Sequence, residues 1–479
     1  MKRTIRNIFY IASALYMMGC GKNEAETISE SSILIEVEAP RTNGWSTEEN
    51  IGTRCDQTIK EEGKDGLDME VSTQPGSDTP TGQVTTRWTN LDDGITFRVI
   101  AYKCASPANI TTANYAGYGD YKLSGITVQA TKNLVLPIGT YTFVCYSYGN
   151  STAIPAFNNS TTSVSATNGQ NFMTCVKPNI TINITGSKYT LSNIVFIHQC
   201  VQYRILAKAQ SGRMHNITAC SAILTLPANS ATYKFTDQSF TTNAIAGSIN
   251  VTWTNPKAMA VYSDYIYVLP QSARNITIKF NAITIGGKIF TNKNITPTVT
   301  INANGTYTST VSFSTTEGYI VGGAMWANGN LIYSGGTYSF HSTTMGCSKA
   351  NKATDYFVFN NPYPSNPELV STWSDSRDPC RKVFPINTWK TPTVQNYESL
   401  LKAGVVVGTD RTTYGGTLIL PFTSFMRFTS GYPHEPYFDF IGYYLSTSYL
   451  RCLQNNTIST AESSTGEILA FPVRCVRVQ

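Results

Sequence analysis

Residues 134–146 of this 479-residue chain, LVLPIGTYTFVCY, carry the pattern that predicts its fold class. β-branched, aromatic and other apolar side chains lie on both sides of Pro137-Ile138-Gly139, and proline followed by glycine is typical of a tight turn. Residues 96–102, TFRVIAY, have the same usage, which fits the pleated surface of a sheet. These segments predict strands of an antiparallel sheet.

Similar segments recur along the chain, and long amphipathic helical windows are almost absent. A second group of them follows His215, at residues 217–226, 248–254, 260–269, 275–285 and 289–300. Gly286-Gly287 and Asn304-Gly305 add two-residue hairpin signals. With 41% hydrophobic and only 14% charged residues, the composition favours β-sandwiches. We therefore expect a mainly β protein with two tandem antiparallel β-sandwich domains, at residues 88–208 and 209–314.

Residues 315–479 have a different character, with denser tryptophan and proline and one convincing helix. In residues 389–404, WKTPTVQNYESLLKAG, threonine and proline precede the helix and glycine ends it. Val394, Tyr397 and Leu401 would line one face of this helix. The sequence predicts a separate α+β domain here.

The first 20 residues, MKRTIRNIFYIASALYMMGC, combine a basic start with an apolar run. The run, Ile8 to Met18, is too short to cross a hydrocarbon core of ~30 Å as a helix, so it predicts an export signal over residues 1–20. The end of this stretch, MMGC, resembles a bacterial lipobox, with Met17 in place of the usual leucine. Cys20 is then the site of lipid attachment and the contact with the membrane. The alternative is an ordinary secreted protein whose signal happens to end near a cysteine.

The segment after Cys20 is acidic. Residues 22–94 contain 16 acidic and 6 basic side chains, whereas residues 95–479 contain 14 acidic and 27 basic ones. An acidic segment that is poor in apolar residues buries too little surface to offset the entropy of ordering it. We expect residues 21–87 to form a leader or pro-segment without a packed core.

Several function classes are not supported by the sequence. The basic residues are scattered and no nucleic-acid motif is present, so no DNA or RNA partner is expected. The chain has no G-x-S-x-G, H-E-x-x-H or phosphate-loop motif, and we expect neither an enzyme nor a cofactor. No CxxC pair occurs and the four histidines lie far apart, so no metal site is expected. The ten cysteines other than Cys20 fit disulfides in an exported chain, although several could be buried thiols.

The lipobox, the acidic leader with its arginines, DDGITFRVIAY at residues 92–102 and LPIGTY at residues 136–141 together resemble the Bacteroidota fimbrillins. These are the type V pilus subunits and their accessory pilins, and the resemblance covers residues 1–314. It implies a lipidated precursor that reaches the outer membrane and is cut after an arginine. The cut would remove an N-terminal strand and open a groove that a strand of another pilin subunit fills. Arg87 is the expected processing site, and Arg54 and Arg41 are the alternatives; Arg87 could also be a solvated linker residue.

The C-terminal block resembles the fibrobacter-type major paralogous (FISUMP) domain. The matching segments, in the family's order, are residues 326–331, 378–380, 389–393, 442–448 and 473–476. The sequence departs from that family at Lys390-Thr391 and at Tyr444-Leu445. The resemblance implies a C-type-lectin-like module whose two chain ends pair, with a disulfide between Cys380 and Cys475.

Aromatic residues at the end of this block are candidates for ligand contact. Tyr432 and Tyr437 could pack on a sugar ring or a protein anchor, or they could be core residues. Glu435-Pro436 resembles the start of the calcium-binding turn of lectins. Because Tyr437 stands where that turn has asparagine, we expect a plain surface loop and no calcium.

Taken together, these observations predict a non-enzymatic tip or accessory subunit of a fimbrium. Its partners would be other pilin subunits, through strand donation, and host or bacterial glycans or proteins. It would be an outer-membrane lipoprotein at the cell surface first and part of the fimbrium later. The alternative is a surface lipoprotein that binds glycan or protein ligands and never polymerises.

Overall fold

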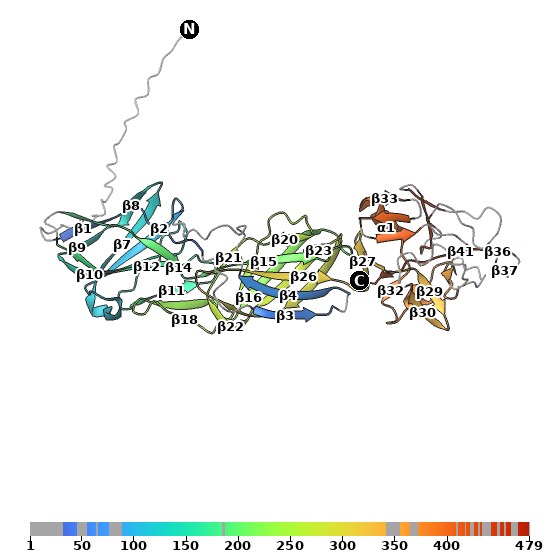
Figure 1. Cartoon of the computed structure of the whole chain (residues 1–479), viewed down its shortest axis with the longest axis horizontal. Helices are drawn as coiled ribbons and strands as arrows, with labels where there is room; N and C mark the ends of the chain where they lie inside the picture. Colours follow the sequence, from blue (N-terminus) through green and yellow to red (C-terminus); the bar gives the residue numbers. More distant parts are fainter. Residues whose placement is uncertain are drawn as a thin grey trace, which may run out of the picture.

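The computed structural model describes fifteen segments of the chain: residues 32–45, 55–63, 66–75, 89–183, 187–341, 355–364, 372–408, 411–416, 418–421, 426–429, 432–433, 442–447, 451–454, 457–460 and 468–478. They form three lobes in a row, which we call the N-terminal, middle and C-terminal lobes (Figure 1). Nearly all regular structure is β, with one α-helix in the described residues. The expected mainly β fold is confirmed. None of the described helices is long and apolar enough to span a membrane.

The N-terminal lobe is built on an eight-stranded sheet. In spatial order its strands are β5 (Thr89–Asn90), β2 (Arg41–Thr42), β14 (Val195–His198), β12 (Met173–Ile182), β10 (Gly139–Ser147), β6 (Thr96–Tyr102), β7 (Tyr115–Ser124) and β8 (Thr127–Lys132). A three-stranded sheet packs on one face: β13 (Lys188–Leu191), β1 (Ser32–Val37) and β9 (Leu134–Pro137). Another covers the other face: β11 (Ser163–Thr167), β17 (Ser230–Lys234) and β18 (Phe240–Thr242).

This three-layer arrangement explains why the central strands are apolar at successive positions. On β10, Phe143 and Cys145 face the core that contains β1, whereas Val144 and Tyr146 face the core that contains β17. A strand that is covered on both faces buries every side chain, so it lacks the simple alternation of a half-exposed strand.

The middle lobe is a sandwich of two larger sheets. One sheet has the order β20 (Ala260–Tyr262), β15 (Val201–Ala209), β26 (Thr306–Ser314), β4 (Asp68–Pro75) and β3 (Cys55–Glu61), and β21 (Ile266–Val268) also pairs with β15. The other contains β19 (Gly247–Val251), β16 (Ile217–Leu226), β23 (Thr277–Ile285) and β24 (Lys288–Ile295). A short pair, β22 (Gln271–Asn275) and β25 (Thr298–Ile301), completes the lobe. Val71, Ile205 and Val311 of the first sheet share one core with Leu224 and Phe280 of the second.

The boundary between the two sandwiches differs from the expected one at residue 208. β14 ends in the N-terminal lobe at His198, and β15 begins in the middle lobe at Val201, so the chain crosses near residue 200. The chain also returns to the N-terminal lobe in β17, where the Tyr233 hydroxyl lies 3.1 Å from that of Thr174. The lobe to which a segment belongs depends on which strands it pairs with, and these strands are far away in sequence. The composition of the segment does not reveal those partners.

The leader also departs from expectation. Its described parts form β1 to β4, and Ile33, Ile35, Met69 and Val71 are buried in the two cores. The expectation of a segment without a packed core is wrong for these parts. Mean composition hid a period of two, because the buried residues of β1 and β4 lie two positions apart and share one face of each strand.

The C-terminal lobe consists of small sheets around one helix. Its strands are β27 (Gly318–Val321), β28 (Ala324–Ala327), β29 (Leu331–Ser334), β30 (Thr337–Phe340), β31 (Phe357–Val358), β32 (Trp389–Lys390), β33 (Val405–Val407), β34 (Arg411–Tyr414), β35 (Leu418–Pro421), β36 (Met426–Thr429), β37 (Tyr432–Pro433), β38 (Gly442–Tyr444), β39 (Arg451–Gln454), β40 (Thr457–Thr460), β41 (Ile468–Phe471) and β42 (Val476–Arg477). β42 lies between β28 and β32, so the beginning and the end of this lobe pair in one sheet. Cys380 and Cys475, 5.8 Å apart at their Cα atoms, form a disulfide. This is the pairing that the C-terminal resemblance implies.

The predicted helix is present as α1 (Val394–Lys402). The hydroxyl of Thr393 accepts a hydrogen bond from the backbone of Asn396, and the Asn396 side chain accepts one from the backbone of Thr393, which closes a capping box. Tyr397 and Leu400 are the fully buried residues of the helix, whereas Leu401 is only partly buried. The buried face is therefore shifted by one residue from the predicted one.

Candidate functional site

Four of the eight predicted site residues lie outside the described part of the chain: Cys20, Arg54, Arg87 and Tyr437. Tyr432 lies on β37, which pairs with β36, but its side chain is not described. Arg41, the remaining candidate for processing, lies on β2 and pairs with β14 on one side and β5 on the other. Proteases cut exposed, unpaired chain. The folded protein therefore does not present Arg41 as a cleavage site.

The first leader strand, β1, is an interior strand of its sheet. It runs parallel to β13 and antiparallel to β9, so Leu34 aligns with Lys188 on one side and with Val135 on the other. Ile33 and Ile35 point into the core at 3% and 1% exposure. The hydroxyl of Tyr121 donates a hydrogen bond to the carbonyl of Ile35 at 2.9 Å. Without β1, β9 and β13 would each have an unpaired edge beside an open apolar trough.

The fourth leader strand, β4, occupies an equivalent place in the middle lobe. It pairs with β26 over eight residues, from Asp68 to Pro75, and with β3 on its other side. Thr73 shares a hydrogen bond of 2.5 Å with Ser309, and both side chains are buried. A segment that precedes the first expected domain thus completes the cores of two lobes.

The leader also reaches the C-terminal lobe. Gly66, in the turn before β4, has a left-handed φ of 79°, and a Cβ there would lie 2.8 Å from Glu317 and 3.0 Å from Arg477. Glu317 and Arg477 form an ion pair. The left-handed backbone conformation is what favours glycine at this turn, whereas the nearby atoms are the ends of flexible side chains that could move aside.

Between β2 and β3 the leader places Trp45 against rings from two lobes. The Trp45 ring stacks on that of His198, with centroids 3.8 Å apart and planes 17° apart. It is also stacked with Tyr267 of β21, with centroids 5.8 Å apart. His198 belongs to the N-terminal lobe and Tyr267 to the middle lobe, so Trp45 lies where the leader crosses between them. Sequence reasoning missed this residue, although a tryptophan in an otherwise polar leader is a signal.

Hydrogen bonds fix the His198 ring in this stack. Its Nε2 lies 3.1 Å from the hydroxyl of Thr42, and its Nδ1 lies 2.7 Å from Oδ1 of Asn171. Burial lowers the pKa of His198 to about 4, so the ring is neutral at pH 7. With its proton on Nδ1, the neutral ring donates to Asn171 and leaves Nε2 as an acceptor for the Thr42 hydroxyl. That hydroxyl has a single proton and also lies 2.9 Å from the carbonyl oxygen of Asn43, to which it can donate instead. The thiol of Cys200 also donates to Asn171.

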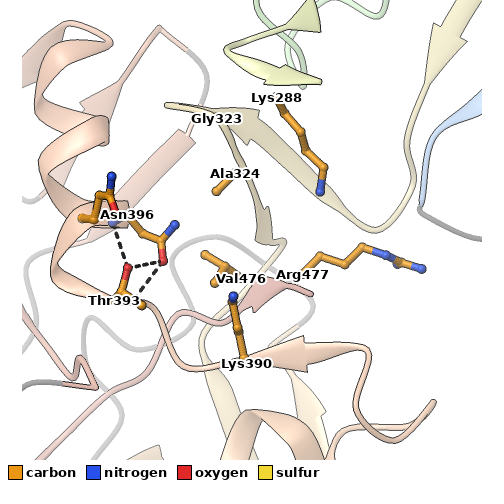
Figure 2. A pocket seen from close by; sticks show the side chains of 9 residues that line it. Lys288, Gly323, Ala324, Lys390, Thr393, Asn396, Val476 and Arg477 are labelled. Carbon is orange, nitrogen blue, oxygen red and sulfur yellow. Dashed lines mark hydrogen bonds between the residues drawn. The ribbon is translucent and has the colours of Figure 1, made fainter. Parts of the chain in front are cut away.

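A basic cavity of about 250 Å³ lies between the middle and C-terminal lobes. Figure 2 shows Lys288 and Lys390 extending towards it from opposite sides, with Thr393 and Asn396 at one wall. Its lining, as far as the structure describes it, includes Arg477 and no acidic residue. Among the described residues, no group of three His, Cys, Asp or Glu could hold a metal ion.

Comparison with known proteins finds similarity only to solved structures. No protein-family model matches the chain, and neither does any curated protein. A putative cell adhesion protein from Bacteroides fragilis is 14% identical, with a TM-score of 0.37, over 65% of this chain and 97% of that one. The tip fimbrial protein Mfa3 of Porphyromonas gingivalis, with a C-terminal truncation, is 10% identical, with a TM-score of 0.30, over 47% of this chain and 94% of its own. The fimbrial anchor protein Mfa2 of the same organism is 9% identical, with a TM-score of 0.26, over 52% and 78%.

Proposed function

We propose that this chain is a non-enzymatic tip or accessory subunit of a fimbrium, in which the leader strands hold places that a partner's strand later takes. The observation that carries the proposal is the position of β1 and β4. Both are interior strands that complete an apolar core, yet both belong to a segment that precedes Arg87 in sequence. A chain that loses them must take up another strand to satisfy the exposed backbone groups and apolar surface.

The choice of arginine decides how much is opened. A cut after Arg54 separates β1 and β2 from the rest of the chain and leaves β3 and β4 in place. A cut after Arg87 separates all four strands and opens both lobes at once. We propose Arg87 as the processing site, because one continuous strand donated by a partner could then replace the whole leader.

We also propose that a lipid on Cys20 delivers the chain to the outer membrane and that the mature subunit lies at the end of a fimbrium. β42 lies inside its sheet, and Cys475 is tied to Cys380. This segment is therefore not available for donation to another subunit. A subunit that accepts a strand without giving one suits a terminal place.

Processing and strand uptake are tested on protein that begins after Cys20. An arginine-specific protease should separate the leader, and the body should then bind a labelled peptide of residues 32–75. The Arg87→Gln variant should keep β3 and β4, whereas Arg54→Gln should still lose all four strands. A body that binds no strand after cleavage would favour the non-polymerising surface lipoprotein.

For the C-terminal lobe we propose a lectin-like, FISUMP-type adhesive module, supported by the pairing of β28 with β42 and by the disulfide. Tyr432 and Tyr437 are the proposed ligand contacts. The full chain should bind defined members of a glycan and matrix-protein array. Tyr432→Ala or Tyr437→Ala should weaken that binding, whereas Tyr363→Ala, an exposed tyrosine of the same lobe, should not. Equal loss in all three variants would contradict the assignment.

A further inference from the structure

The Trp45 stack has features that strand pairing alone does not require. β2 is only two residues long, and Trp45 lies beyond its end. Even so, the Trp45 ring covers His198, which is only 4% exposed. The same ring also stacks with Tyr267 of the middle lobe. We call the surface formed by the rings of His198 and Tyr267 the aromatic slot.

The aromatic slot lies beyond the end of β2, where the backbone pairing of the leader with β14 is short. A strand that crosses from one sheet to another can slip by two residues and still present the same face to each core. The leader contacts β14 through only a short parallel stretch, in which the amide of Arg41 donates to Ile194 and that of Asn43 donates to Phe196. The Trp45 ring contacts both lobes, so it adds a side-chain anchor to this short stretch of backbone pairing.

We propose that the aromatic slot is the register-setting subsite for the incoming strand, and that it selects a hydroxyl residue followed three positions later by a planar aromatic side chain. The occupant is an extended segment of a partner subunit, with the spacing that Thr42 and Trp45 have in the leader. This inference rests on the proposed function, because the leader must leave before the aromatic slot can accept a partner.

The chemistry of the aromatic slot supports both parts of this preference. His198 Nε2 contacts the Thr42 hydroxyl, so a valine at that position would leave a buried nitrogen without a partner. The faces of His198 and Tyr267 are flat and nearly parallel to the Trp45 ring, within 17° and 19°. Flat faces favour offset-stacked aromatic rings over aliphatic side chains.

The experiment uses the full chain with a specific protease site placed in residues 46–54. After cleavage, the retained leader is exchanged against labelled peptides of residues 32–45, and the dissociation constant and exchange rate are measured. We expect the native peptide and Trp45→Tyr to bind within a few-fold of each other. Trp45→Ala should bind about 30-fold more weakly or worse, the loss typical of an aromatic anchor. Thr42→Val should also weaken binding, and Glu38→Ala, at an exposed position, should not.

Variants of the body complete the test. Tyr267→Ala should weaken the native peptide but leave the Trp45→Ala peptide unchanged, since that peptide has no ring to lose. If the native and Trp45→Ala peptides bind equally well, the aromatic slot has no selective role and the inference is wrong, while strand exchange still stands. If no peptide enters after cleavage, both the inference and the proposed function fail.

Discussion

Replacing Ile35 by alanine should loosen the leader far more than the same change at its neighbour Leu34. Ile35 is 1% exposed and faces the core, whereas Leu34 is only partly buried on the opposite face of β1. Truncation of a buried isoleucine to alanine costs about 2–5 kcal/mol, through lost transfer energy and the cavity left behind. We take about 3 kcal/mol for Ile35, which corresponds to roughly 150-fold in affinity, and about 1 kcal/mol for Leu34, or roughly 5-fold.

In the assay, the cleaved leader carries a fluorophore on residues 32–45. The rate of its release is measured in the presence of excess unlabelled peptide. Ile35→Ala should speed release by about 10²-fold, and Leu34→Ala by less than about tenfold, since most differences in affinity between related complexes lie in the dissociation rate. Leu34 is the matched control, because it adjoins Ile35 and is also aliphatic. Equal acceleration by the two variants would refute the idea that β1 is held by its buried face.

Two further predictions concern the C-terminal disulfide and the histidine of the aromatic slot. Replacing both Cys380 and Cys475 by alanine opens a loop that spans a sequence separation of 95. In the chain-entropy account, this should lower the free energy of unfolding of the C-terminal lobe by about 4–5 kcal/mol. Urea unfolding, monitored by tryptophan fluorescence, measures this change, and an unchanged midpoint would contradict it. Leader affinity should fall as the pH drops from 6.5 towards 4, because departure of the leader uncovers His198 and raises its pKa from about 4 towards its ordinary value of 6.5. The body then binds a proton that the leader-bound form does not. The loss at pH 5 should be at most about 30-fold, the value for a complete return of the pKa to 6.5, and should be absent in His198→Phe. Cys200 and Tyr267, which face this ring or its partner, have pKa values raised by burial and do not titrate in that range.

Local sequence patterns account for much of the fold. The capped helix begins and ends close to where its boundary residues predict. Pro137 to Gly139 separates β9 from β10 as expected, but the two strands enter different sheets and do not pair, so the segment is a bend between sheets and not a hairpin turn. The leader departs from its expected lack of a core because the spacing of its apolar residues, and not its acidic composition, determines which side chains are buried. Ile33 and Ile35, and likewise Met69 and Val71, are two residues apart, which is the period of a strand with one buried face.

The candidate site was less accessible from sequence, because its partners are far apart along the chain. Thr42 and His198 are 156 residues apart, and Trp45 meets Tyr267 across a lobe boundary that the sequence placed at residue 208 instead of near residue 200. No local signal marks such pairs. Only the crossing of the leader from one lobe to the next brings them together.

Side-chain period, turn residues and helix caps act within a few residues, so the amino-acid sequence predicts the helix, many of the strands and the hairpin of β23 and β24 at Gly286-Gly287. The strands on either side of Asn304-Gly305 belong to different sheets, so that hairpin prediction is wrong. Which strand becomes an interior strand depends on long-range pairing, and tertiary structure alone decided that β1 and β4 complete two cores. The same holds for the lysines at the basic cavity, which come from different lobes. A strand's own residues specify that it needs a covered face, but the residues that cover this face belong to other parts of the chain.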